Sequence, residues 1–211
     1  MPVMGGNGGR FVVAGATLLL HGWVDNGAAR IAIVPGAPTS AMSTALAERT
    51  ERSGKPDLKV ELRAESFRIP RAAVEPTPAG DADLRIGQDV LARQPIAIDF
   101  ARHALQPLSA GEARTAERSA SAIAVTRAPD GTLTVPISTD GGAPIVAQLD
   151  LSSATGVAAP GLTARSAVSL GPVTLRGVEV ADGARPIVGL YAFRHMRVIF
   201  DLGHDRIWVR G

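Results

Sequence analysis

The stretch Val146-Ala-Gln-Leu-Asp150-Leu-Ser-Ser153 decides the fold that we expect, because an apolar strand ends there in one carboxylate and a loop of small residues. An earlier stretch, Ile31-Ala-Ile-Val34-Pro-Gly-Ala37, has the same shape without the carboxylate. Each follows an apolar strand and a turn signal, Asn-Gly at 26–27 and Asp-Gly-Gly at 140–142. These residues tolerate the positive φ of tight hairpin turns. The chain therefore looks like one unit written twice.

The second half of each unit repeats as well. Gly87 precedes Asp99 by twelve residues, and Gly189 precedes Asp201 by twelve. Each Asp ends an apolar strand and is followed by a short closing strand. A period of roughly one hundred residues indicates two lobes and not a solenoid. We therefore predict two copies of one all-β fold, related by a pseudo-two-fold axis.

This repeat divides the chain into four parts. Residues 1–10 are rich in glycine and predict a flexible N-terminus. Residues 11–107 form lobe one and residues 129–211 form lobe two. Between them, residues 108–128 are small and polar, which indicates a linker that can become transiently helical.

Two further local predictions follow from the pattern. The apolar run 11–20 follows an Arg and could be the core of a signal peptide, but the repeat aligns it with a strand of lobe two and favours a strand. Short helices are predicted at 39–50, capped by Ser40 or Thr39, and at 88–92.

The order of these elements resembles the aspartic peptidase fold. The closest likeness is to the bacterial retropepsin-like proteins, and two such lobes in one chain look like a compact pepsin-type pseudo-dimer. The resemblance covers nearly the whole chain from Phe11. It implies a cleft between the lobes, suited to an extended peptide held by main-chain hydrogen bonds. In that family each lobe presents Asp, Thr or Ser, Gly and a small residue, and Gly87 and Gly189 match the glycine that threads beside each Asp loop.

The sequence departs from that family at the catalytic motif. Lobe one has Val34-Pro35-Gly36-Ala37 in the motif, and lobe two has Asp150-Leu151-Ser152-Ser153. Aspartic peptidases use two carboxylates that share one proton, one to activate water and one to polarise the scissile carbonyl. A single Asp in a monomer cannot form that pair. The resemblance also implies a cross-lobe hydrogen bond from the Thr or Ser, for which Pro35 and Leu151 have no hydroxyl.

The role of Asp150 stays open at this point. It can cap its own loop through backbone N–H groups, without any chemistry. It can instead be half of a carboxylate site, either in a ligand-binding cleft or in a homodimeric or unconventional acid–base site. A third alternative is a pair completed by Asp25, since Val24-Asp-Asn-Gly-Ala28 resembles the motif by spelling, although the repeat places it at a hairpin turn.

The family resemblance also implies a set of residues around the cleft. The stretch 59–71 alternates apolar and polar residues and would be the flap over the cleft, with Phe67 as its only aromatic. Two serines beside a carboxylate could suit a hydrolase, but the sequence places no His to activate them. Our candidates are Asp150 for catalysis and, for binding, Val34, Gly36, Phe67, Ser152 and Ser153.

Composition excludes several classes of protein. The chain has 211 residues, 45% of them hydrophobic, which is enough for a folded core. It has no Cys, which excludes disulfides, thiol catalysis and zinc–thiolate sites. The net charge is only +2 and the arginines are spread along the chain, so we expect no nucleic-acid partner. No apolar run approaches the ~18 residues of a membrane span.

We expect no cofactor and no metal. A metal pair of His204 with Asp201 or Asp205 is conceivable, but residues that cap a turn explain these positions better, and we take Asp99 and Asp201 as structural. We expect a monomer, because the pseudo-dimer lies in one chain. The sequence does not name the compartment, although an exported or periplasmic location is favoured.

Two functions remain. The first is an aspartic-peptidase-like protein that has lost the carboxylate pair and binds an extended peptide or another ligand between its lobes. The second is an active hydrolase with Asp150 as base and an unidentified second acid. The carboxyl groups within reach of Asp150 discriminate between them.

Overall fold

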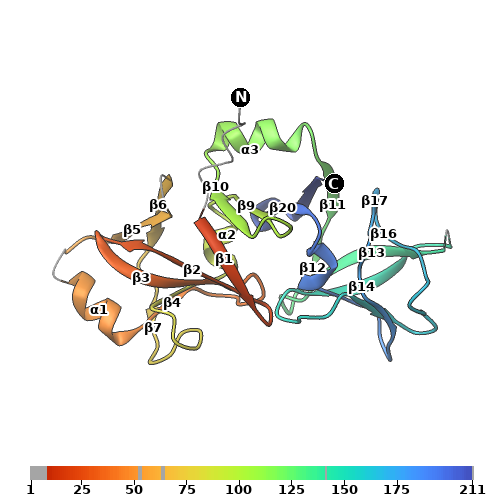
Figure 1. Ribbon diagram of the computed structural model, residues 1–211, viewed down its shortest axis with the longest axis horizontal. Helices are drawn as coiled ribbons and strands as arrows, with labels where there is room; N and C mark the ends of the chain where they lie inside the picture. The colour runs from red at the N-terminus through yellow and green to blue at the C-terminus, as the bar shows by residue number, and fades with distance from the viewer. Residues whose placement is uncertain (1–8, 52–53, 63–64, 141, 211) are drawn as a thin grey trace.

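Two β lobes flank a central sheet in the computed structural model, which describes residues 9–51, 54–62, 65–140 and 142–210. Figure 1 shows the lobes at left and right, with the central sheet and helix α3 between them at the top. The predicted all-β, two-lobed fold class is therefore confirmed. Residues 1–8 of the predicted flexible N-terminus lie outside the described part.

Twelve elements form the first half: β1 (Gly9–Ala14), β2 (Thr17–Val24), β3 (Gly27–Ile33), β4 (Ala41–Met42), α1 (Thr44–Glu51), β5 (Asp57–Leu62), β6 (Glu65–Pro70), β7 (Ala73–Val74), β8 (Leu84–Ile86), α2 (Gln88–Leu91), β9 (Ile96–Asp99) and β10 (Ala104–Pro107). The segment expected to be a linker contains α3 (Ala110–Glu117), β11 (Ser121–Ala124) and β12 (Thr126–Arg127).

The second half contains β13 (Leu133–Thr139), β14 (Ile145–Asp150), β15 (Val157–Ala159), β16 (Val168–Leu170), β17 (Val173–Thr174), β18 (Val180–Asp182), β19 (Ile187–Gly189), β20 (Arg197–Asp201) and β21 (Arg206–Arg210). Two short 3-10 turns, η1 (Leu190–Phe193) and η2 (Leu202–His204), flank β20.

The central sheet joins the two lobes. Its order is β11-β21-β20-β9-β10-β1, and every pairing in it is antiparallel. Strand β1 continues into the sheet of lobe one, of order β1-β2-β3-β8-β4-β7, with β5 and β6 attached through β2. Lobe two has the separate order β17-β16-β13-β14-β19-β15-β18. Each lobe therefore supplies two closing strands to a shared platform.

The closing hairpins of the two lobes have the same register. Asp99 lies opposite Ala104 in β9–β10, and Asp201 lies opposite Arg206 in β20–β21. Both residues of the second pair lie 102 positions after their counterparts in the first pair. Gly87 and Gly189 are separated by the same 102 residues. The internal repeat seen in the sequence is therefore a repeat of structure.

The pseudo-two-fold axis passes through the middle of the central sheet. Strands β9 and β20 are neighbours, and Ala97 lies directly opposite Ile199, its own equivalent in the repeat. One continuous core of mostly Val, Leu and Ile runs through both lobes, where alternate strand residues point inward. In it Phe193 and Phe200 pack edge to face with ring centroids 6.0 Å apart.

Local predictions are partly confirmed. The apolar run 11–20 forms parts of β1 and β2, as the strand interpretation requires. The predicted hairpin after β2 is present, but the residues with positive φ are Asp25 and Asn26, one position earlier than the Asn-Gly pair, because Gly27 already pairs with Val24 as the first residue of β3. Helix α1 begins later than predicted, because Ser43 accepts a hydrogen bond from the Leu46 N–H (3.2 Å) and Ser40 is used elsewhere.

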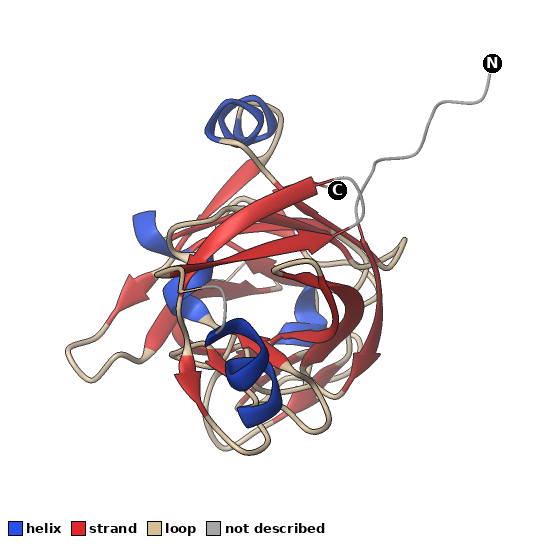
Figure 2. Ribbon diagram, turned by 90° about the vertical axis from the view of Figure 1, so that its left-hand side faces the viewer, coloured by secondary structure: helices blue, strands red, loops and turns tan. Residues whose placement is uncertain are grey.

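The connecting segment folds on the outside of the central sheet. Helix α3 has a complete capping box, in which Ser109 and Glu112 satisfy each other's backbone N–H groups. Hydrogen bonds from Ser109 lower the pKa of Glu112. A second apolar cluster, made of Ala97, Leu108, Ala113 and Ile199, lies between α3 and the sheet. Figure 2 shows α3 above the strands at the top of the molecule. Within the described residues, no helix is long and apolar enough to cross a membrane.

Candidate functional site

Two equivalent loops leave the ends of β3 and β14. In the first, the Ala37 N–H donates to the Val34 carbonyl oxygen (2.9 Å). In the second, the Ser153 N–H donates to the Asp150 carbonyl oxygen (3.1 Å). The two turns are the same, so Val34 occupies in lobe one the place that Asp150 occupies in lobe two, as the repeat predicts.

A glycine passes beside each loop because no side chain would fit. A Cβ on Gly87 would lie 2.6 Å from the carbonyl oxygen of Thr39, and a Cβ on Gly189 would lie 2.4 Å from that of Thr155. Both distances are far below van der Waals contact. The sequence pattern of an apolar step ending in Gly therefore marked a real requirement of the backbone.

The two loops touch across the pseudo-two-fold axis. A Cβ on Gly36 would lie 2.3 Å from the backbone nitrogen of Ser152. This close approach brings the predicted binding residues Gly36 and Ser152 together. It places Val34 and Asp150 two residues away from the contact, one on each side.

The carboxylate of Asp150 is hydrogen-bonded within its own loop. Its Oδ1 accepts hydrogen bonds from the Ser152 N–H (3.1 Å) and the Ser152 hydroxyl (2.5 Å). The side chain is half-buried, and Ser153 is likewise accessible, with its hydroxyl 2.9 Å from that of Thr155. Of the alternatives left open by the sequence, loop capping is the one that the hydrogen bonds of Asp150 display.

Asp25 does not complete a pair with Asp150. It lies in the turn at the opposite end of β3 from Val34, and seven strand residues at ~3.3 Å each separate the two positions by roughly 20 Å. Its Oδ1 accepts a hydrogen bond from the Lys59 N–H (3.0 Å). This turn therefore resembles the catalytic motif in its sequence of residues but not in its position in the fold.

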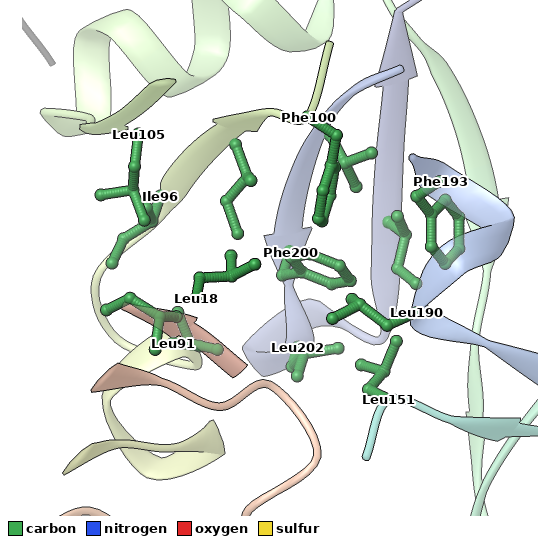
Figure 3. Close-up of a cluster of buried hydrophobic side chains, with 14 of the residues drawn as sticks. Leu18, Leu91, Ile96, Phe100, Leu105, Leu151, Leu190, Phe193, Phe200 and Leu202 are labelled. Atoms are coloured by element: carbon green, nitrogen blue, oxygen red, sulfur yellow. The ribbon is translucent and has the colours of Figure 1, made fainter. Parts of the chain in front are cut away.

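Apolar residues occupy the two loop positions for which the resemblance implied a cross-lobe hydroxyl. Pro35 is buried, and Leu151 is only 1% exposed. Figure 3 shows Leu151 beside Leu190 and Leu202, below Phe200. Leu151 thus anchors its loop in the core of lobe two, and the two lobes meet at this point through the close backbone approach of Gly36 to Ser152.

Phe67 is not placed as predicted. It is 7% exposed and belongs to the main core, and its strand β6 pairs with β5, which pairs with β2. The alternation of residues 59–71 was correct for a strand pair, but the apolar side packs on lobe one. A ligand could not contact Phe67 without opening that core, so we remove it from the binding candidates.

A partly buried hydrogen-bond network behind the lobe-one loop was not predicted from the sequence. Ser40 is 3% exposed, accepts a hydrogen bond from the Gly87 N–H (3.0 Å) and donates to Asp89 (2.7 Å). Ser40, one of the two residues predicted to cap the helix at 39–50, is part of this network instead. The signal that could have revealed the network is Asp89, an acid placed two residues after the step glycine.

Asp99 and Asp201 stabilise equivalent turns, as predicted. Asp99 accepts hydrogen bonds from the Arg102 N–H (2.9 Å) and guanidinium (3.2 Å). Asp201 lies 2.7 Å from the Nδ1 of His204, also three residues later. Among the described residues, no group of three or more His, Asp or Glu side chains is arranged to hold a metal.

The hydrogen bond from His204 to Asp201 raises the pKa of His204 above its ordinary 6.5. A raised pKa in the folded state means that protonation stabilises the fold. We expect this contribution to be complete below pH 6.5 and to be lost as pH rises through the raised pKa. Thermal unfolding is measured from about pH 5 to about pH 8.5, which extends about one and a half pH units or more on each side of the ordinary His pKa. The loss of stability with rising pH should be seen in the parent and in His21→Gln, an exposed control, but not in His204→Gln. Equal pH dependence in all three would contradict it.

Several cavities of the described chain lie away from the two loops. They surround the central sheet and α3, with volumes up to about 570 Å³, and none is lined by residues of the two loops. Asp150 is half-buried and lines none of these cavities.

Comparison with solved structures agrees with this architecture. Basic 7S globulin from soybean matches with a TM-score of 0.56 and 8% sequence identity, over 96% of this chain and 93% of the globulin. Conglutin gamma, a basic 7S globulin from lupine seeds, matches with a TM-score of 0.61 and 7% identity, over 97% and 94%. The fold is that of the pepsin-like aspartic proteases. No protein-family model and no curated protein matches the sequence.

Proposed function

We infer that this protein is an aspartic-protease-like protein without ordinary peptidase turnover, which binds an extended peptide in the cleft between its lobes. The compact lobes, of roughly one hundred residues each, support a retropepsin-like type of lobe within this fold. The observation that carries the proposal is that Val34 stands where the second carboxylate would be needed, and no carboxyl group of the described residues is hydrogen-bonded to Asp150.

Binding remains possible where catalysis does not. Asp150, Ser152, Ser153 and Thr155 all keep some exposure on one loop, and their oxygens and hydroxyls can take hydrogen bonds from a peptide backbone. An aspartate that is already oriented by Ser152 needs no reorganisation to accept another N–H. This favours recognition of a peptide over activation of water.

The proposal predicts no cleavage. Loss of either the base or the acid removes a contribution of about a hundredfold to ten-thousandfold in rate. An unfolded protein and a mixed peptide library, incubated with the purified chain at acid and at neutral pH, should stay intact. Pepstatin-type inhibitors should not bind tightly, because they resemble a transition state held by two carboxylates.

Binding is tested on the same samples. Peptides captured from the library should bind about tenfold more weakly to Asp150→Asn, which loses the charge but keeps an acceptor for Ser152. Asp130→Asn is the matched control, since Asp130 is an exposed loop carboxylate whose pKa is lowered by the Thr132 N–H. Cleavage that disappears in Asp150→Asn would support the active hydrolase instead. If the peptides are neither cleaved nor captured, the binding proposal is refuted.

A further inference from the structure

Two arginines lie opposite each other on the closing hairpin of lobe two. Arg197 of β20 pairs in register with Arg210 of β21. Side chains two residues apart on a strand share a face, so both arginines are on the side of Ile199 and Trp208, which pack towards α3. Directly opposed like charges destabilise a sheet, so this pair has a cost.

Neither arginine has a partner for its charge within the described part of the chain. Asp99 lies opposite Arg197 on the neighbouring strand, but both of its carboxylate oxygens accept hydrogen bonds from Arg102. Arg197 and Arg210 make no side-chain hydrogen bond and no ion pair with any described residue. Two guanidinium groups on paired strands are thus left without an acidic partner among the described residues.

The fold itself does not require charge at these positions. The equivalent residues in lobe one are Pro95 and Leu108, which the same register brings together, and the Leu108 N–H donates to the Pro95 carbonyl oxygen (2.9 Å). Leu108 is buried under α3. Lobe one therefore builds this corner from apolar residues, whereas lobe two accepts an electrostatic penalty.

Space for a ligand adjoins the pair on both sides. An opening of about 490 Å³ is lined by both arginines together with Arg102 and His195. Another, of about 560 Å³, is lined by both arginines and by hydroxyl side chains of the α3 segment, among them Ser119. Both volumes are in the range of small-molecule sites. Asp99 also lines the first opening and Glu112 the second. Both carboxylates already accept hydrogen bonds from protein groups, Asp99 from Arg102 and Glu112 from Ser109, whereas neither arginine has such a partner among the residues that the structure describes.

We propose that Arg197 and Arg210 form a binding site for the phosphate- or sulfate-type oxyanion of a small ligand. Arginine presents a planar fork of N–H donors that matches such oxyanions bidentately. An anion between the two guanidinium groups removes their mutual repulsion and supplies the missing partner of each. The site lies on the α3 side of the central sheet, away from Asp150, and does not depend on the proposed peptide binding.

The test is a titration of the purified chain with inorganic phosphate and with sulfate, at an ionic strength kept constant with sodium chloride. Calorimetry or NMR should show saturable binding by the parent. Arg197→Gln and Arg210→Gln should each weaken it about tenfold or more, because each removes charge-assisted hydrogen bonds. Arg165→Gln, at an exposed position elsewhere in lobe two, should bind as the parent does. Circular dichroism checks that every variant is folded.

Further probes identify the source of the oxyanion. Glycerol phosphate represents a soluble phosphomonoester, and phosphatidylcholine vesicles with or without phosphatidic acid represent a lipid headgroup. Arginine-dependent binding of either supports the site and assigns its ligand. Equal binding by the parent and both arginine variants would mean non-specific screening and would overturn the proposal, as would the absence of saturable binding with every probe.

Discussion

Gly36→Ala is expected to destabilise the protein by about 3 kcal/mol, at the upper end of what overpacking of a core costs. The added Cβ would lie 2.3 Å from the nitrogen of Ser152 and 2.6 Å from its Cα and Cβ. Two of these three atoms belong to the backbone and cannot rotate away. The lobes would have to separate at the point where the two loops meet, so the burial of Leu151 would also suffer.

Urea denaturation of the parent and the variant measures this effect. The matched control is Gly111→Ala in α3, where no atom lies within 4 Å of the new Cβ. Alanine is the better helix former by about 1 kcal/mol, so this control should be neutral or slightly stabilising. A Gly36→Ala midpoint equal to that of the parent would show that the loops are not in contact.

Val34→Asp is expected to make stability strongly dependent on pH. Equivalent positions on loops that touch should bring the introduced carboxylate close to Asp150. Two carboxylates at close range cannot both be ionised without cost, so the folded variant would keep a proton that the unfolded chain has released. Stability should then fall as pH rises from about 4 to 7, by roughly 1.4 kcal/mol for each unit by which proton release is displaced.

Val34→Asn separates charge from size. Asparagine has the same shape as aspartate but does not ionise. The pH dependence of the stability of Val34→Asn should therefore be the same as that of the parent. If the aspartate and asparagine variants had the same pH profile, positions 34 and 150 would not face each other. We expect the aspartate variant not to cleave peptides, because Ser152 still holds Asp150 and neither Pro35 nor Leu151 supplies a cross-lobe hydroxyl.

The repeat, the hairpins and the departure from the catalytic motif could all be predicted from the sequence. These features depend on local chemistry. Residues such as Asn26 tolerate the positive φ of a hairpin turn, and an alternation with a period of two residues determines which face of a strand is buried. Glycine is needed at 87 and 189 because a carbonyl oxygen lies too close for any Cβ. The absence of a second aspartate at position 34 is a property of the sequence alone once the repeat is aligned.

Tertiary structure alone decided what those residues touch. An alternating strand such as the one with Phe67 has a buried face, but only the assembled sheet shows whether that face covers a core or a cleft. The commitment of Asp150 to Ser152 depends on the conformation of one loop. Arg197 and Arg210 are thirteen residues apart and unremarkable in the chain until β20 and β21 pair. Charges that the sequence spreads out become neighbours through strand register, and register is set by packing over the whole sheet.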